Sequence, residues 1–132
     1  MNIGEAAEQS GMSAKMIRYY ESVALLKSAK RSPSGYRIYS ANDVHTLRFI
    51  RQARVLGFSV EKIRELLALW QNQRRKSETV RKLALEHVAE IESNIADLQE
   101  MKATLMTLVK SCHGDSRAEC PILEGLSGSI RN

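Results

Sequence analysis

The sequence predicts a mainly α-helical fold, in which a compact N-terminal domain precedes one long helix and a short C-terminal segment. Three observations predict it. Residues that can cap helices recur directly before segments with helical apolar spacing. The stretch from Ser77 to Lys110 contains neither glycine nor proline. A turn-rich stretch at 30–39 ends in β-type residues and is long enough for one small hairpin.

The first two helices are expected to form a helix-turn-helix. Asn2 can cap a helix over 3–9, which Gly11 ends. Ser13 can cap the next helix, over 14–21. Two short helices joined by a tight turn that contains glycine form this motif.

A wing and two further helices complete the predicted N-terminal domain. Pro33, Ser34 and Gly35 favour a turn, and the Tyr-Arg-Ile-Tyr run at 36–39 favours a strand. We therefore expect a small hairpin here, the wing of a winged helix. The two helices that follow each have a serine in the capping position: 41–56 after Ser40 and 60–71 after Ser59.

The segment 77–110 is predicted to be one helix, about 50 Å long at 1.5 Å per residue. Its apolar residues follow an alternating spacing of four and three, which is typical of a coiled-coil seam. One chain cannot bury such a seam alone, so we expect a dimer; the alternative is that the helix packs on its own N-terminal domain. The seam consists of Val80, Ala84, His87, Ile91, Asn94, Leu98, Met101, Leu105 and Leu108, of which His87 and Asn94 are the two polar members.

These elements divide the 132 residues into three expected parts. A winged helix-turn-helix domain is expected at 1–72, a dimerisation helix at 73–110, and a loop with a C-terminal tail at 111–132. A chain of this length is too short for a large α/β barrel or a two-domain dinucleotide enzyme. No long apolar run predicts a membrane span, and no basic-then-apolar leader is present, so we expect a cytoplasmic protein without a membrane partner.

The positive charge lies entirely in the N-terminal half. Residues 1–60 hold nine basic and four acidic side chains, which accounts for the whole net charge of +5. Residues 61–132 hold equal numbers of both signs, and no aromatic residue follows Trp70. A basic compact half indicates a polyanionic partner, here double-stranded DNA. No catalytic constellation is recognisable, so the chain is not expected to be an enzyme.

The candidate DNA-binding residues lie on the second helix and on the wing. Lys15, Arg18 and Tyr19 share one face of that helix, which suits a recognition helix in a major groove, whereas Ile17 and Tyr20 are expected to point toward the core. Cations and hydroxyl groups on the wing suit phosphate contacts. The full candidate set is Lys15, Arg18, Tyr19, Tyr20, Arg31, Tyr36, Arg37 and Tyr39.

Two cysteines flank a polar loop near the C-terminus. Cys112 and Cys120 are separated by seven residues, close enough in sequence for their sulfur atoms to meet. Two thiols without a function, or a disulfide between them, are the alternatives. The expected cytoplasmic location is reducing and argues against the disulfide. Structural zinc takes four ligands, so two thiolates better suit a soft monovalent ion, Cu(I), with Ag(I) or Au(I) as alternatives. We expect one ion per chain; His113 has no assigned role.

Four segments together resemble a known family, the MerR transcription regulators. The first three are IGEAA at 3–7, IRYYE at 17–21 and GYRIY at 35–39. The tail, with CHGD at 112–115 and CPIL at 120–123, resembles the copper-responsive branch of that family. The resemblance covers the whole chain.

The resemblance implies a homodimer whose long helices pair antiparallel as a coiled coil. It implies a promoter site between the −35 and −10 elements, and activation by distorting that DNA so that RNA polymerase engages both. In such a dimer Ser77 of one chain approaches Cys112 and Cys120 of the other. The family's divalent-metal sensors carry cysteine at this position, so serine withholds a third soft donor.

The sequence therefore favours a Cu(I)-responsive transcriptional activator of copper efflux or homeostasis genes. In this hypothesis metal binding orders the loop and the segment 121–126, which then packs on the partner helix and the DNA-binding domain. One alternative is the same scaffold responding to Zn(II), Hg(II) or an oxidant through the two thiols. A less favoured alternative is a copper storage or chaperone protein that does not bind DNA.

Overall fold

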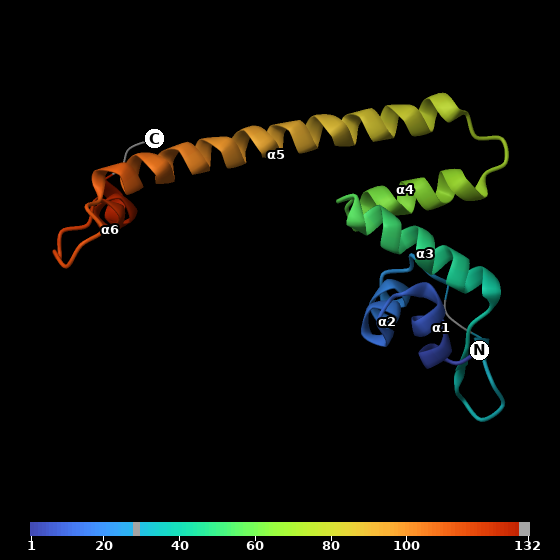
Figure 1. Cartoon of the computed structure of the whole chain (residues 1–132). Helices are drawn as coiled ribbons and strands as arrows, with labels where there is room; N and C mark the ends of the chain where they lie inside the picture. Colours follow the sequence, from blue (N-terminus) through green and yellow to red (C-terminus); the bar gives the residue numbers. More distant parts are fainter. Residues whose placement is uncertain (28–29, 130–132) are drawn as a thin grey trace. The chain divides into compact units, whose positions relative to one another are not determined.

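The computed structural model describes residues 1–27 and 30–129, which form helices and one small hairpin (Figure 1). Each predicted helix begins and ends within one residue of its expected bounds, so the mainly helical prediction is confirmed. The elements are α1 (Ile3–Ser10), α2 (Ala14–Ser22), β1 (Lys30–Arg31), β2 (Arg37–Ile38), α3 (Ala41–Val55), α4 (Val60–Gln71), α5 (Ser77–Ser111), α6 (Pro121–Glu124) and the π-type turn η1 (Gly125–Ser129).

Side-chain caps determine where the first four helices begin. Asn2, Ser13, Ser40 and Ser59 each accept a hydrogen bond from a backbone N–H in the first turn of the following helix. Such caps satisfy N–H groups that have no partner inside the helix. Gly11 ends α1 in the left-handed conformation, with φ of 74°. A side chain there is strained, which explains why glycine occupies this turn.

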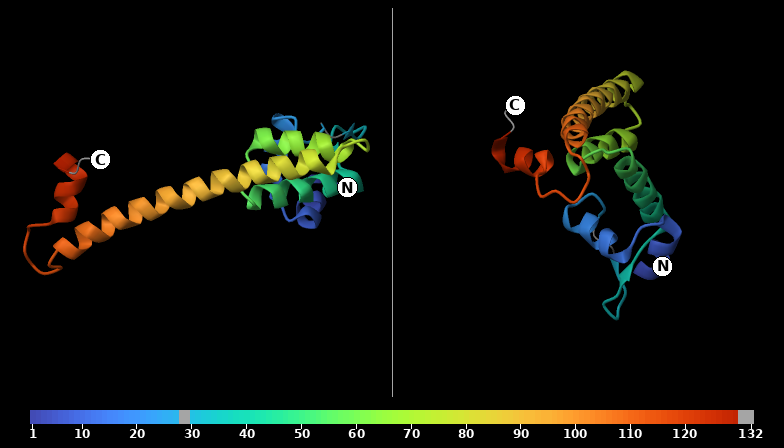
Figure 2. Two further views of the ribbon diagram at one scale, coloured as in Figure 1. Left: turned by 90° about the horizontal axis from the view of Figure 1, so that it is seen from above. Right: turned by 60° about the vertical axis from the view of Figure 1, so that its left-hand side comes forward.

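The hairpin predicted as a wing projects from the helices around it (Figure 2). Its strands are antiparallel, with Lys30 opposite Ile38 and Arg31 opposite Arg37. The backbone of Tyr39, directly after β2, exchanges two hydrogen bonds with Met1, at 2.7 and 2.8 Å. These bonds tie the base of the wing to the start of α1.

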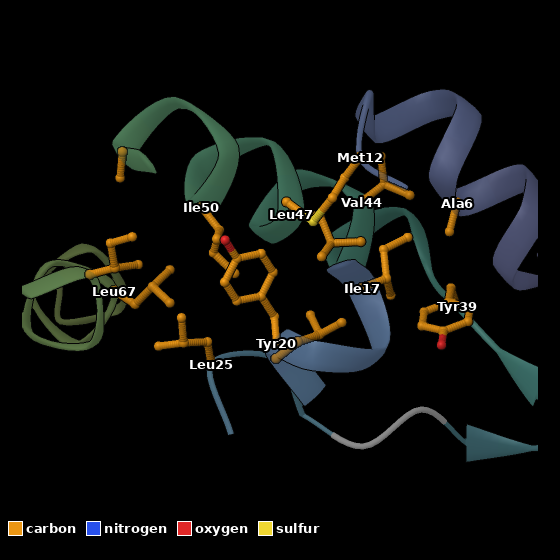
Figure 3. Packing of buried hydrophobic residues seen from close by; sticks show 13 residues of the cluster. Ala6, Met12, Ile17, Tyr20, Leu25, Tyr39, Val44, Leu47, Ile50 and Leu67 are labelled. Atoms are coloured by element: carbon orange, nitrogen blue, oxygen red, sulfur yellow. The ribbon is translucent and has the colours of Figure 1, made fainter. Parts of the chain in front are cut away.

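The chain forms two compact units, residues 1–81 and 82–132. The core lies in the first unit, where α1 packs against α2 and α3, and α3 packs against α4. Figure 3 shows this cluster at close range. Its buried residues are Ala6, Met12, Ile17, Tyr20, Leu25, Leu26, Tyr39, Val44, Leu47, Ile50, Ala53, Ile63 and Leu67.

The long helix α5 buries none of its residues within this chain. Large apolar side chains stay exposed along it, including Ile91, Leu98, Met101 and Leu105 of the predicted seam. Across the described residues, no helix is long and apolar enough to cross a membrane.

Candidate functional site

Helix α2 presents a basic and aromatic face. Lys15, Arg18 and Tyr19 are exposed on it, with Tyr19 at 45%. Ile17 on the opposite face is fully buried, as its position in the helical period predicts. The helix is therefore anchored by its apolar face, and its cationic face is left open to solvent.

A basic cleft lies between α2 and the wing. Its volume is about 580 Å³, and it brings Arg18 together with Arg31, Tyr36 and Arg37. Asn2, Ile3 and Gly35 complete the lining. Tyr36, which directly precedes β2, is 74% exposed. Cationic and hydroxyl groups gathered in one concave surface are suited to hold the phosphates of a nucleic acid.

The carboxylate of Glu21 lies next to Arg37, one of the residues that line this cleft. Glu21, in the last turn of α2, accepts a hydrogen bond from the Tyr39 hydroxyl. Its second oxygen, Oε2, lies 3.5 Å from Arg37 Nη1, and its side chain is only 7% exposed. Burial, and next the hydrogen bond to Glu21, raises the pKa of Tyr39 above its usual value. The pair that Glu21 forms with Arg37 links the recognition helix to β2.

Two of the predicted DNA-binding residues are buried. Tyr20 is 2% exposed and Tyr39 is 1% exposed, and both belong to the core cluster (Figure 3). Their rings have no surface to offer a nucleic acid, so the candidate DNA contact at these two positions is corrected to a packing role. For Tyr39 the physical reason is its acceptor: the hydroxyl finds Glu21 inside the domain rather than a phosphate outside it.

Three arginines outside the predicted set donate to backbone carbonyls. Arg48 donates from Nε and Nη2 to the Gln9 carbonyl, at 3.0 and 2.8 Å. Arg64 donates from Nη2 to the Val23 carbonyl at 2.7 Å, just past α2. Arg54 similarly reaches the Phe58 carbonyl at 3.2 Å. Helix C-termini leave carbonyls unpaired, and arginines favour such positions. Because the acceptors of Arg48 and Arg64 lie about forty residues away, sequence periodicity gives no sign of them.

The two cysteines lie in the second unit, at the two ends of one loop. Cys112 directly follows α5, and Cys120 caps α6, in which Pro121 is the first residue. Both are half-buried and free of a disulfide. The backbone N–H of Leu123, then that of Ile122, and a hydrogen bond from the Cys112 thiol lower the pKa of Cys120.

The donor set fits a soft ion with few ligands. Two free thiols at the ends of one short loop supply two sulfur donors, and the backbone N–H groups of Leu123 and Ile122 favour the anionic thiolate of Cys120. No group of three or more histidine, cysteine or acidic side chains with metal-site geometry occurs in residues 1–27 and 30–129. His113 is exposed beside Cys112. Ser77 begins α5, and therefore lies a whole helix away in sequence from the cysteines.

An ion pair between Asp115 and Arg117 lies inside the loop that separates the two cysteines. The Asp115 carboxylate accepts hydrogen bonds from the Arg117 backbone N–H at 2.9 Å and from Arg117 Nε at 2.8 Å. These bonds lower the pKa of Asp115. Although both side chains are exposed, the pair limits the conformations of the loop.

Sequence comparison places the chain in one family over most of its length. The profile of the MerR HTH family regulatory proteins matches residues 1–70, and the MerR DNA-binding profile matches 44–108. Heavy metal-dependent transcription regulator 2 of Rhizobium meliloti (strain 1021) is 58% identical over 127 residues, which cover 96% of this chain and 86% of that protein. The HTH-type transcriptional regulator CueR of Salmonella typhimurium is 44% identical, covering 97% of this chain and 93% of that protein.

Solved structures give the same result. The transcription regulator PbrR691 from Ralstonia metallidurans CH34, in complex with lead(II), is similar with a TM-score of 0.83 and 31% identity, over 96% of this chain and 98% of that one. MerR from Bacillus megaterium MB1, in complex with mercury(II), has a TM-score of 0.73 and 30% identity, over 96% and 99%. The chain belongs to the MerR family of HTH regulatory proteins and is a DNA-binding transcription regulator, not an enzyme.

Proposed function

We propose that this protein is a Cu(I)-responsive transcriptional activator of copper homeostasis genes, with Cys112 and Cys120 as the metal ligands. The observation that carries the proposal is the placement of two free, half-buried thiols at the two ends of one short loop, Cys112 directly after α5 and Cys120 directly before α6. Two sulfur donors suit Cu(I), and by the same chemistry Ag(I) or Au(I). The similarity to CueR and to heavy metal-dependent regulators over nearly the whole chain supports metal sensing.

The proposal places Ser77 beside the cysteines of a second chain. A helix of 35 residues spans about 50 Å, so Ser77 of the same chain is out of reach. An antiparallel dimer brings the start of one α5 near the end of the other. A serine hydroxyl is a poor ligand for a soft ion, so the site keeps two strong donors and discriminates against ions that need more.

The exposed seam of α5 supports the homodimer. None of its described residues is buried within one chain, and aqueous exposure of such an apolar stripe is unfavourable. A second copy has the same stripe and covers it by coiled-coil packing. In this assembly 1–72 binds promoter DNA, 73–110 forms the dimer and 111–132 binds the metal.

Activation then follows from promoter geometry. Two basic domains fixed to one dimer bind two half-sites, and the DNA between them bends and untwists. A change in the segment 111–132 shifts the dimer between two states, of which one holds the promoter so that RNA polymerase engages both of its elements.

A second candidate function is sensing of a divalent ion through the same thiols. The structural similarity to regulators that were solved with lead(II) and mercury(II) favours it. Mercury(II) also accepts two thiolates, whereas lead(II) and zinc(II) are better held by three or four donors.

A metal competition experiment separates these candidates. The full-length protein is titrated with Cu(I) and with Hg(II), Pb(II) and Zn(II) against chelators of known affinity, and X-ray absorption counts the sulfur ligands. Cu(I) bound tightly by two sulfurs, with loss on Cys112→Ser or Cys120→Ser, supports the proposal. Tighter binding of a divalent ion, or Cu(I) binding that survives both substitutions, contradicts it. The matched control is Ser116→Ala, which changes the same loop but no thiol.

A further inference from the structure

We propose that Glu21 is a positioning residue for DNA binding, because it holds the wing arginine Arg37 against the recognition helix. The inference deepens the DNA-binding part of the proposed function. Glu21 belongs to α2 and Arg37 to β2, so their pairing connects the two elements that line the basic cleft. An acidic residue behind a DNA-binding surface opposes DNA binding by charge alone, so its position there requires an explanation.

The geometry supplies that explanation. Arg37 in β2 and Tyr39 directly after it are two residues apart, and in an extended backbone such side chains point to the same side. Both reach Glu21: Tyr39 donates to Oε1, and Arg37 Nη1 lies 3.5 Å from Oε2. A single carboxylate therefore contacts two side chains of the wing from the end of the recognition helix.

Burial makes loss of the Glu21 carboxylate costly. The Glu21 side chain is 7% exposed, and Arg37 Nη1 is buried with no hydrogen bond to any described residue. Its compensation is thus the nearby charge of Glu21. A buried cation without that charge is costly, so loss of the carboxylate would drive the guanidinium to a different position. Since the Arg37 side chain as a whole is 35% exposed, part of the guanidinium remains able to reach a phosphate in the cleft with Arg18 and Arg31.

Charge and positioning predict opposite results for Glu21→Gln. If Glu21 acts only through its charge, removing it makes the cleft more positive, and DNA binds more tightly. If Glu21 positions Arg37, the substitution releases the guanidinium, and DNA binds more weakly. The matched control is Glu8→Gln, which removes one negative charge from an exposed residue of α1 that pairs with no described cation.

The experiment measures DNA binding by the full-length protein. The probe is a 30-base-pair duplex that the wild type selects from a randomised pool, titrated by fluorescence anisotropy at several salt concentrations. We expect Glu21→Gln to weaken DNA binding about tenfold. This is the effect of losing one charge-assisted hydrogen bond, here the one from the Arg37 guanidinium to a DNA phosphate. We also expect the slope of log K against log salt to shrink by about one phosphate contact. Glu8→Gln should leave both quantities close to the wild-type values.

A double-mutant cycle tests the pairing itself. Arg37→Gln alone should weaken binding about tenfold, and in the Glu21→Gln background it should add less than twofold, because the arginine is already misplaced. Additive losses, or Glu21→Gln binding as tightly as Glu8→Gln, overturn the proposal. If Glu21→Gln loses its helical circular dichroism, Arg37→Lys decides: it keeps the charge, and wild-type affinity with this variant also overturns the proposal. A wild-type protein that selects no duplex contradicts the proposed function instead.

Discussion

Replacement of Arg64 by alanine should destabilise the N-terminal domain through the recognition helix. Arg64 lies on α4 and donates to two carbonyls in the turn after α2, from Nη2 to Val23 at 2.7 Å and from Nη1 to Ala24 at 3.4 Å. Ala24 stands in the left-handed region with φ of 60°, which alanine adopts only at a cost. Arg64 therefore holds a strained turn in place.

The expected loss follows from the two contacts. A hydrogen bond from a charged donor contributes about 1.5–3 kcal/mol when it is protected from water. The Arg64 side chain is 43% exposed, and its hydrogen bond to the Ala24 carbonyl is long at 3.4 Å. We therefore reduce the expected loss of unfolding free energy to a total of about 1 kcal/mol. With a urea m-value of about 2 kcal/mol/M, the unfolding midpoint should fall by roughly 0.5 M.

Urea unfolding followed by circular dichroism measures the effect. The control is Arg81→Ala, since Arg81 is an exposed arginine of α5 that donates no hydrogen bond to a described residue. The reasoning is refuted if Arg64→Ala and Arg81→Ala shift the midpoint equally. It is also refuted if Arg64→Ala is neutral.

Three further predictions concern the core, the turn and the wing. Leu47→Ala removes a fully buried side chain and should lower the free energy of unfolding by about 2–5 kcal/mol, measured by urea unfolding. Gly11→Ala places a Cβ at φ of 74°, 3.4 Å from Arg51 Nε, and should lower the unfolding free energy by about 1–2 kcal/mol; an unchanged thermal midpoint would contradict it. The pKa of Tyr39 is raised above 10.0 in the folded chain, so the stability that its protonated hydroxyl contributes is fully present below pH 10 and is lost as pH rises through the folded pKa. Wild-type stability should therefore fall more steeply than that of Tyr39→Phe in urea titrations from about pH 9 to 11, and parallel curves would argue against the Glu21 contact.

Local signals made most of the helices predictable. Asn2, Ser13, Ser40 and Ser59 mark helix starts by a bond to an amide three residues on, so a short stretch of sequence is sufficient. The long α5 is predictable from the absence of breakers alone.

Interactions between residues that are far apart in the sequence were harder to predict. The sequence predicted Tyr39 to be an exposed residue of the wing. The alternation of side chains along a strand of two residues does not show which face of that strand packs on the core. The partner of its hydroxyl, Glu21, lies eighteen residues earlier in the chain. Nothing in the sequence indicated the partners of Arg48 and Arg64, since the carbonyl groups of Gln9 and Val23 lie about forty residues earlier in the chain. The position of Cys112 and Cys120 at the two ends of one loop was predictable, because only seven residues separate them in the sequence.

Transcription reconstituted from purified RNA polymerase, the full-length protein and its own promoter tests the central claim most directly. Transcript yield is measured with buffered Cu(I) and without it, for the wild type and for the Cys112→Ser/Cys120→Ser double variant. The account predicts that Cu(I) raises the yield with the wild type and leaves it unchanged with the double variant, while both proteins still bind the promoter. Equal Cu(I)-dependent activation by both proteins would contradict it.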